Sequence, residues 1–231
     1  MATSTVEDYL KCILLEQQKN PADRVTTGRI AASLRVAPGT ATAMVKTLAQ
    51  SSLVAYEPYS GVHLTESGRQ LATHVLRRHR LVELFLVKIL GLDWSEVHDE
   101  AEHLEHVVSD RVIERMDHML GYPSVDPHGD PIPNAEGVVE EPDGVSLLGC
   151  STTQAVRVVR IDDQSPEFLQ LVERRGLKPG SRLQVAHRDP AADTVELRLA
   201  VGGDLSLGWR AASKIFVLPE RDDPGPAAMA P

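Results

Sequence analysis

The sequence predicts a mainly α-helical chain with a small amount of β structure, ending in a small β-barrel. Three observations indicate this fold class. Apolar residues recur at three- and four-residue spacing through most of residues 6–120, as in amphipathic helices. Beyond residue 150 the period changes to two, which is typical of half-buried strands. Residues 124–149 are rich in Pro, Gly and Asp, and we expect a linker there that few packing contacts cross.

The first part of the chain has the pattern of a helix-turn-helix. Residues 6–17 carry apolar side chains at helical spacing and predict a first helix. A second short helix, capped by Thr26 or Thr27, and a third helix starting at Gly39 are joined by a turn at residues 35–38. Two short helices joined by a tight turn form a helix-turn-helix.

A β-wing and two long helices are expected to follow. Residues 53–57 and 62–65 read as two strands joined by a short turn, which forms the wing. A helix then runs from Thr65 to about residue 90. Ser95 reads as the cap of another long helix, over residues 96–120.

The remainder of the chain predicts the barrel. Residues 166–173 can form one helix, and residues 176–181 a turn. The tail from Glu220 is expected to be disordered. Apolar residues at strand spacing mark four strands: Val156 to Ile161, Leu183 and Val185, Val195 to Leu199, and residues 215–218.

Composition excludes several classes of protein. The chain has 231 residues, of which 42% are hydrophobic and 25% charged, and this argues against global disorder. The longest apolar candidate, residues 81–92, is interrupted by two charges and is too short to cross a bilayer. Cys12 and Cys150 are the only cysteines, which excludes a disulfide framework and a multi-cysteine zinc cluster. Because the start also lacks the pattern of an export signal, we expect a cytoplasmic protein with no membrane partner.

Charge divides the chain into a basic module and an acidic body. The formal net charge is −9. Residues 1–80 carry ten Lys or Arg and six Asp or Glu, a net charge of +4, whereas residues 81–231 carry fourteen and twenty-seven, a net charge of −13. The basic module is compatible with a polyanionic partner. An aromatic content of 4% argues against single-strand binding by base stacking.

The densest group of metal-competent side chains lies on the two long helices. His79 and Glu83 are four residues apart on the first. The ordinary alternative to a metal site is that these residues are solvated charges on exposed helices. Apolar residues beside the polar ones favour an inward-facing site: Val82, Leu86, Leu104 and Val107. A helix advances by about 100° per residue, so four residues of the second long helix fall within an arc of about 100°: His98, Glu102, Glu105 and His106.

Residues 78–83, 91–110 and 127–133 resemble the diphtheria-toxin repressor family of metal-activated transcriptional regulators, and the resemblance covers nearly all the chain. It implies a homodimer that binds a near-palindromic operator in double-stranded DNA and takes no small-molecule substrate. The implied organisation is a winged helix-turn-helix domain (1–73), a helical metal-binding and dimerisation domain (74–140), a linker (141–150), an SH3-like barrel (151–219) and a disordered tail (220–231).

The resemblance also implies two metal sites. An ancillary site would use His79, Glu83 and His98, completed from the barrel by Glu167 and Gln164. The alternative for Glu167 is an exposed carboxylate at a helix start, where the helix dipole favours it. The primary site would use four residues: Asp8, Glu102, Glu105 and His106.

Departures from the family pattern bear on the identity of the metal. Iron-type members have Met and Cys where this chain has Asp8 and Glu102, and exchanging sulfur for oxygen shifts the preference towards Mn²⁺. We therefore expect a manganese-dependent repressor of metal-homeostasis genes, with Fe²⁺ or another divalent first-row metal as the alternative. Compact manganese regulators carry Glu at the position of Lys11, which cannot bind metal while protonated, so their two-metal arrangement should not transfer unchanged.

The resemblance places the third helix in the major groove of DNA. Small residues at its start permit close approach but offer few donors, so sequence preference should depend on methyl contacts and DNA shape. Arg24 would add a phosphate contact. The residues expected to contact DNA are Arg29, Arg35, Pro38, Gly39, Thr40, Thr42 and Lys46.

Two readings from other classes stay open at this point. A dinuclear metallohydrolase would also use paired His and Glu ligands, but the sequence shows no evident substrate loop or separate base. The barrel could be a peptide-binding module, although its few aromatic residues disfavour a groove for proline-rich ligands. We therefore expect no enzyme activity, and we expect the barrel to interact with other parts of the same chain.

Overall fold

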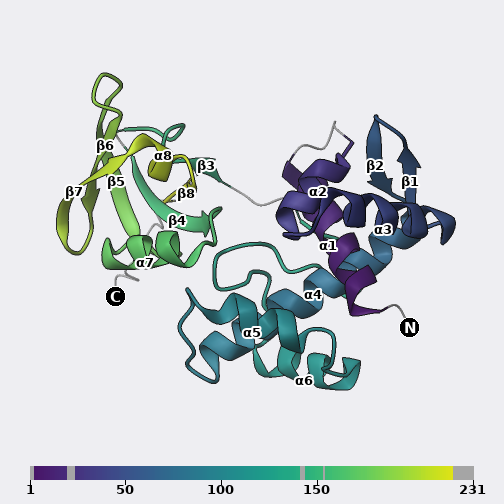
Figure 1. The fold of residues 1–231 in the computed structure, drawn as a ribbon. Coiled ribbons are helices and arrows are strands. Elements are labelled where there is room, and N and C mark those ends of the chain that lie inside the picture. Colours follow the sequence, from purple (N-terminus) through teal and green to yellow (C-terminus); the bar gives the residue numbers. More distant parts are fainter. Residues whose placement is uncertain (1–2, 20–23, 141–143, 153, 221–231) are drawn as a thin grey trace, which may run out of the picture. The chain divides into compact units, whose positions relative to one another are not determined.

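The computed structural model describes residues 3–19, 24–140, 144–152 and 154–220 (Figure 1). Most of the expected disordered tail, and residues 141–143 of the expected linker, lie outside the described residues. The chain divides into two compact units. The first comprises Met1–Gly91, His98–Ser124 and Pro131–Glu140, and the second comprises Leu92–Val97, Val125–Asp130 and Glu141–Pro231.

The first unit begins with the expected winged helix-turn-helix. Thr26 caps α2, because its Oγ1 accepts a hydrogen bond from the backbone N–H of Arg29 at 3.2 Å. Arg35 adopts a positive φ of 53° in the turn, and Pro38 opens α3. The elements are α1 (Ser4–Lys19), α2 (Thr27–Ser33), α3 (Pro38–Gln50) and the antiparallel strands β1 (Val54–Glu57) and β2 (Gly61–Leu64).

A single apolar core joins α1 to the rest of this module. Leu10 and Ile13 of α1 are fully buried, together with Ile30 of α2 and Val45 of α3. Helix α1 also packs against α4 (Glu66–Lys88). Because such a core is close-packed, a shift of α1 is transmitted to α2 and α3.

Helix α4 starts where the sequence predicts. The Thr65 side chain accepts a hydrogen bond from the Gly68 N–H at 3.1 Å and caps the helix. A Cβ at Gly68 would lie 1.9 Å from the carbonyl oxygen of Leu53, so glycine is required for the wing to pack against the start of α4. Among the described residues, no helix is both long and apolar enough to cross a membrane.

The expectation of one helix over residues 96–120 is wrong. The structure has α5 (Val97–Leu104) and α6 (Asp110–Met119) with a break between them. Arg78 of α4 explains the break, because its guanidinium donates to the carbonyl oxygen of Glu105, at 2.7 Å, and to that of Val108. These carbonyls are satisfied without continuing the helix, and Ser109 takes the extended conformation of an N-cap residue.

Two smaller expectations about this segment are also wrong. Ser95 does not cap the helix: its hydroxyl donates to Asp93 Oδ1 at 2.6 Å, and α5 begins at Val97. Val107, expected to face inward, is 75% exposed because it lies in the break after α5.

Part of the expected linker is packed against α4. Pro131, Ile132 and Pro133 are buried. Arg80 donates to the carbonyl oxygen of Pro131, and Arg77 donates to that of Pro133 at 2.6 Å. This stretch belongs to the first unit, since arginines of α4 satisfy its backbone carbonyls.

The second unit is built on a six-stranded antiparallel sheet of order β3-β8-β4-β5-β6-β7. The indole N–H of Trp94 in this unit donates a hydrogen bond to Glu173 at 3.1 Å. Its strands are β3 (Val145–Ser146), β4 (Ala155–Ile161), β5 (Arg182–Asp189), β6 (Thr194–Leu199), β7 (Gly203–Gly208) and β8 (Ile215–Pro219). Its helices are α7 (Pro166–Arg174) and α8 (Trp209–Ala212).

Candidate metal centre

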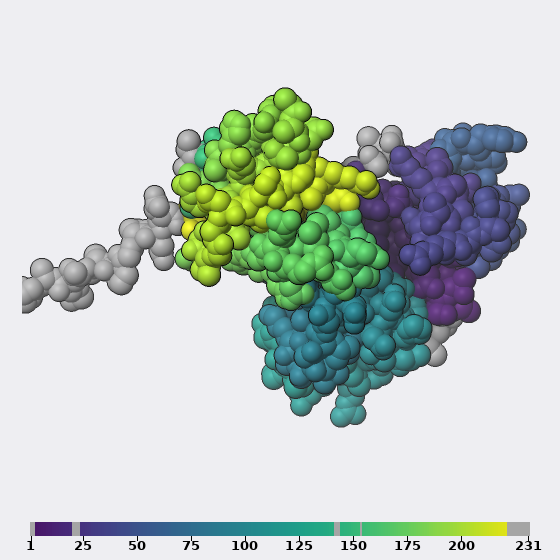
Figure 2. All heavy atoms as spheres, turned by 60° about the vertical axis from the view of Figure 1, so that its left-hand side comes forward, coloured from purple at the N-terminus to yellow at the C-terminus, as the bar shows by residue number. Residues whose placement is uncertain are grey.

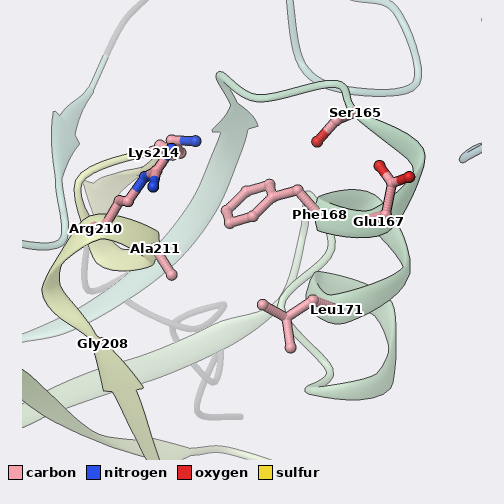
Figure 3. Close-up of a pocket in the computed structure, with 8 residues that line it drawn as sticks. All are labelled: Ser165, Glu167, Phe168, Leu171, Gly208, Arg210, Ala211 and Lys214. Carbon is pink, nitrogen blue, oxygen red and sulfur yellow. The ribbon is translucent and has the colours of Figure 1, made fainter.

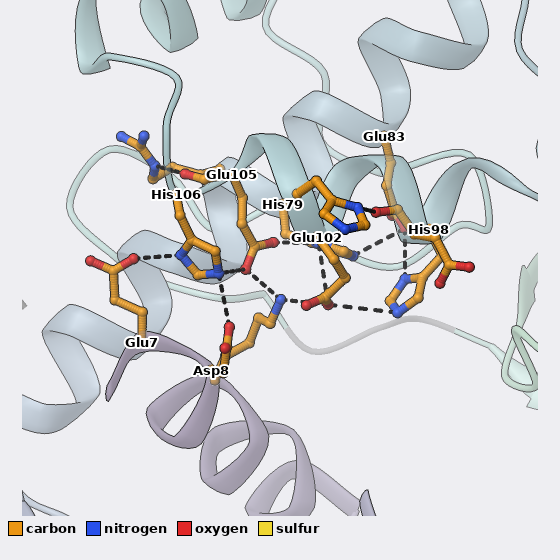
Figure 4. Close-up of polar contacts among 12 residues, drawn as sticks. Glu7, Asp8, His79, Glu83, His98, Glu102, Glu105 and His106 are labelled. Atoms are coloured by element: carbon orange, nitrogen blue, oxygen red, sulfur yellow. Dashed lines mark hydrogen bonds and ion pairs between the residues drawn. The ribbon is translucent and has the colours of Figure 1, made fainter. Parts of the chain in front are cut away.

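Three helices of the first unit bring the predicted His and Glu residues together in one cluster (Figure 4). Asp8 comes from α1, which also contributes the neighbouring Glu7. His79 and Glu83 lie one turn apart on α4. The others come from α5 and the turn after it: His98, Glu102, Glu105 and His106.

One end of the cluster joins α1 to the turn after α5. His106 Nε2 lies 2.8 Å from Asp8 Oδ1 and 3.3 Å from Glu105 Oε1. Asp8, Glu105 and His106 each offer one ligand atom, and these atoms lie within 4.8 Å of one another. Burial raises the pKa of Asp8, although His106 and Lys11 act in the opposite direction.

Glu7 was missed by the sequence analysis. Its Oε2 lies 2.7 Å from Nδ1 of His106, and Figure 4 shows both Glu7 and Asp8 projecting from α1 toward that ring. Burial lowers the pKa of His106, but the hydrogen bond to Glu7 and the charges of Glu105 and Asp8 outweigh it and raise the pKa. A second carboxylate directly before Asp8 was the signal available in the sequence.

The other end of the cluster joins α4 to the start of α5. Glu83 Oε1 lies 3.0 Å from His79 Nε2 and 3.1 Å from His98 Nδ1, so that these three residues form a second group of ligand atoms. His79 Nδ1 lies 2.5 Å from Glu105 Oε2. Burial lowers the pKa of His79, but the charge of Glu83 and the hydrogen bond to Glu105 dominate and raise it to about 9.

A third group of ligand atoms, from His79, Glu102 and Glu105, lies between the two ends. Glu102 therefore faces the middle of the cluster, 3.8 Å from His79 Nδ1 and 3.6 Å from His98 Nε2, rather than the group formed with Asp8. The buried Lys11 places its Nζ 2.7 Å from Glu102 Oε1 and 2.6 Å from Glu105 Oε1. Burial raises the pKa of Glu102, but the Lys11 ammonium outweighs it and lowers the pKa.

The donor set fits a divalent first-row metal ion. Every donor is a carboxylate oxygen or an imidazole nitrogen, and no sulfur is among them, a combination that suits Mn²⁺ and Fe²⁺. The cluster holds five carboxylates, and burial makes their mutual repulsion costly unless cations lie among them. The carboxylates are Glu7, Asp8, Glu83, Glu102 and Glu105.

The two candidate ligands from the barrel lie in the second unit. Gln164 Nε2 donates to Asp130 Oδ2 at 2.6 Å. Glu167 is exposed in the first turn of α7, where it lines a cavity of about 430 Å³ together with Phe168 and Lys214 (Figure 3). In the space-filling view, the green α7 and the yellow segment containing α8 lie side by side at this surface (Figure 2). The part of Glu167 and Gln164 in the ancillary site stays a prediction.

The residues expected to contact DNA lie mostly on an exposed face of the helix-turn-helix. The Thr42 hydroxyl donates to the carbonyl oxygen of Pro38 at 2.9 Å, which leaves its methyl group free for contacts. Arg24 forms an ion pair with Glu57 at 2.5 Å. Six of the residues are exposed: Arg29, Arg35, Pro38, Gly39, Thr40 and Lys46.

Comparison with known families accounts for the order of these parts. Residues 1–62 match the N-terminal DNA binding domain of iron dependent repressors, residues 65–134 match their metal binding and dimerisation domain, and residues 145–219 match the FeoA domain. The chain is 34% identical to the diphtheria toxin repressor of Corynebacterium diphtheriae over 201 residues, 80% of this chain and 85% of that relative. The chain belongs to the diphtheria toxin repressor family.

Two further relatives of the diphtheria toxin repressor family are similar over most of their length. The iron-dependent repressor IdeR of Mycobacterium leprae is 34% identical over 205 residues, 83% of this chain and 87% of IdeR. A manganese-dependent transcriptional repressor, solved in complex with manganese, is 41% identical with a TM-score of 0.85 and is matched over 93% of this chain and all of that chain. The fold class and the family resemblance predicted from the sequence are confirmed.

Proposed function

We propose that this chain is a manganese-dependent transcriptional repressor that binds operator DNA as a homodimer once divalent metal is bound. The observation that carries the proposal is the position of Asp8. It lies on α1, a helix that supplies Leu10 and Ile13 to the core of the DNA-binding module, and its carboxylate is 2.8 Å from His106, which follows α5. Asp8, Glu105 and His106 would hold the cation, and through it they would restrain the DNA-binding module against α5 and the turn that follows it.

The bound metal supplies positive charge at a point where carboxylates from two elements converge. The chain's own residues orient the ligand atoms around this point. Glu7 accepts a hydrogen bond from His106 Nδ1, which leaves Nε2 directed at Asp8 and Glu105. Asp8 lies two residues before Leu10 and five before Ile13, which are both in the core, so its position is coupled to α3 through close-packed side chains.

The coupling needed is modest. If metal favours the DNA-binding arrangement by about 1–3 kcal/mol, operator affinity changes by about 5- to 150-fold. A switch of this size regulates gene expression when the metal concentration crosses the dissociation constant of the site. We place the protein in the cytoplasm and assign it to genes of metal homeostasis.

Manganese is favoured by the oxygen-rich donors, above all by Asp8, where iron-type members of the family have Met. Fe²⁺ is the alternative, since the Irving-Williams series places it above Mn²⁺ for most ligand sets and one matched relative is named as iron-dependent. Selectivity therefore depends on geometry and on metal availability. Replacing one oxygen ligand by sulfur is the sharpest way to test it.

Operator binding titrated separately with Mn²⁺ and Fe²⁺, without oxygen, tests the proposal on the wild type and on Asp8→Met, which replaces an oxygen ligand by the sulfur that iron-type members have. We expect wild-type DNA binding to respond to Mn²⁺, and the variant to shift its preference towards Fe²⁺. A clear preference of the wild type for Fe²⁺ would overturn the manganese assignment. The relatives described above are named as repressors, which disfavours the alternative of a metallohydrolase. Incubation of the metal-loaded protein with phosphoester and peptide substrates tests that alternative directly.

A further inference from the structure

Lys11 occupies the middle of the cluster with its positive charge. The residue is 6% exposed, and its ammonium contacts Glu102 Oε1 at 2.7 Å and Glu105 Oε1 at 2.6 Å. Both carboxylates belong to the third group of ligand atoms, which they form with His79. The ammonium therefore lies where a metal ion would have to bind in order to bridge Glu102 and Glu105.

The three groups of ligand atoms share residues. Glu105 belongs to the group with Asp8 and also to the middle group, and His79 belongs to the middle group and to the group with Glu83. A metal ion in the middle would therefore compete for donors with ions at both ends. A fixed ammonium neutralises the middle carboxylates without consuming the donors at either end.

We propose that Lys11 acts as a tethered cation that takes the place of a metal ion between Glu102 and Glu105 and so limits how many ions each protomer binds. This inference rests on the proposed function, because it concerns the same metal centre. It assigns to Lys11 a part in setting the metal stoichiometry. Since Lys11 lies on α1 one turn after Asp8, its ion pairs also hold α1 against α5 before metal binds.

The arrangement explains how a lysine is tolerated among metal ligands. A buried ammonium is costly unless it is paired, and here two carboxylates at hydrogen-bonding distance compensate it. Removing the ammonium leaves these carboxylates facing each other, a configuration that a divalent cation relieves. The space between Glu102 and Glu105 therefore favours a positive charge, either the Lys11 ammonium or a divalent metal ion.

Equilibrium dialysis against MnCl₂, followed by elemental analysis, tests the proposal on the wild type, Lys11→Met and Lys11→Arg. We expect Lys11→Met to bind one more Mn²⁺ per protomer than the wild type, while Lys11→Arg, which keeps the charge, binds the same number as the wild type. The double variant Lys11→Met/Glu102→Gln removes one carboxylate of the middle group and should lose the extra ion. Equal stoichiometry in the wild type and Lys11→Met would overturn the proposal.

Thermal unfolding monitored by circular dichroism covers the case in which Lys11→Met is unstable without metal. We expect its melting temperature to lie below that of the wild type in chelator, and Mn²⁺ to raise it by a larger increment than in the wild type. If Lys11→Met stays unfolded at saturating Mn²⁺, the proposal is wrong, because metal then cannot take the place of the ammonium. Operator binding of the wild type with and without Mn²⁺ tests the proposed function separately.

Discussion

His106 Nε2 lies 2.8 Å from Asp8 Oδ1, although 98 positions separate the two residues in the chain. This contact joins the helix that supports the DNA-binding module to the turn that follows α5. His106 also contacts Glu7 of the same helix through its other ring nitrogen, at 2.7 Å. One imidazole between two carboxylates therefore links α1 to the turn after α5, beside the ion pairs that Lys11 of α1 forms with Glu102 and Glu105.

Replacing Asp8 with alanine should abolish metal-induced DNA binding while the fold is retained. Asp8 is only partly buried, and its main contact is with His106. We expect the 5- to 150-fold response of operator affinity to metal to fall to about 1, because the cation no longer holds α1. Fluorescence anisotropy with labelled operator measures this. The control is Gln18→Ala, an exposed position on the same helix, which should respond like the wild type.

Glu7 should raise the affinity for metal by holding the ring of His106 in position. Glu7→Ala removes the acceptor for Nδ1 of His106, and partners of this kind typically contribute about 10- to 100-fold to metal affinity. Glu7→Gln keeps an acceptor oxygen and should lose less. Calorimetric titration with Mn²⁺ distinguishes the two variants, and an affinity of Glu7→Ala equal to that of the wild type would show that Glu7 does not position the ring.

Metal binding should release protons at neutral pH. Both ring nitrogens of His79 contact carboxylates, and its raised pKa of about 9 means that the metal-free protein holds this ring protonated at pH 7. A ring that binds metal must lose that proton, so Mn²⁺ affinity should rise as the pH rises from about 6.5 to about 9. Calorimetry in buffers of different ionisation enthalpy measures the protons released, and a heat that does not vary with the buffer would contradict this.

The raised pKa of His79 also determines how the stability of the metal-free protein changes with pH. A group whose pKa is higher in the folded state stabilises the fold fully below its unfolded pKa, about 6.5 for histidine, and this contribution is lost as the pH rises through about 9. The metal-free wild type should therefore lose more stability between pH 6.5 and 9 than His79→Gln. Urea denaturation in chelator at several pH values measures the difference.

Two glycines should respond in opposite ways to substitution by alanine. A Cβ at Gly68 would lie 1.9 Å from the carbonyl oxygen of Leu53, so Gly68→Ala should cost about 1–3 kcal/mol or more. A Cβ at Gly39 would meet no atom of the described residues within 4 Å, and Gly39→Ala in α3 should stabilise by up to about 1 kcal/mol. Denaturant unfolding compares both. Equal stabilities would contradict the packing of the wing on α4.

Lys46 should contribute to operator affinity through phosphate. It is exposed on α3, and Lys46→Ala should weaken binding by similar factors for all sequences and reduce the slope of log affinity against log salt by about 1. Lys19→Ala removes an exposed lysine at the end of α1 and provides the control for net charge. An unchanged salt slope in Lys46→Ala would place this side chain away from the DNA.

Local patterns in the sequence were sufficient for much of the fold. Thr26 caps α2 and α4 starts next to Thr65 as expected, because capping depends on residues only three positions apart. The spacing of His79 and Glu83 was sufficient to place both on one face of α4, whereas their grouping with His98 came from the family resemblance. Helical periodicity and short-range hydrogen bonds decide these features.

The features that were missed depend on contacts between distant segments. Arg78 ends α5 by bonding carbonyls about 30 positions away, and a helical pattern contains no sign of it. Pro131 is held on α4 by Arg80, so a loop with the composition of a linker is packed. Lys11 looked like an obstacle to metal binding, and only the structure shows its ammonium between two carboxylates of the cluster.

The most direct test of the central claim is a crystal structure of the protein bound to operator DNA in the presence of MnCl₂, with anomalous scattering recorded at the manganese edge. The account predicts an anomalous peak bonded to Asp8, Glu105 and His106, with α1 held against the turn after α5. Operator bound in the crystal with no peak at these residues, or with Asp8 directed into solvent, would contradict it.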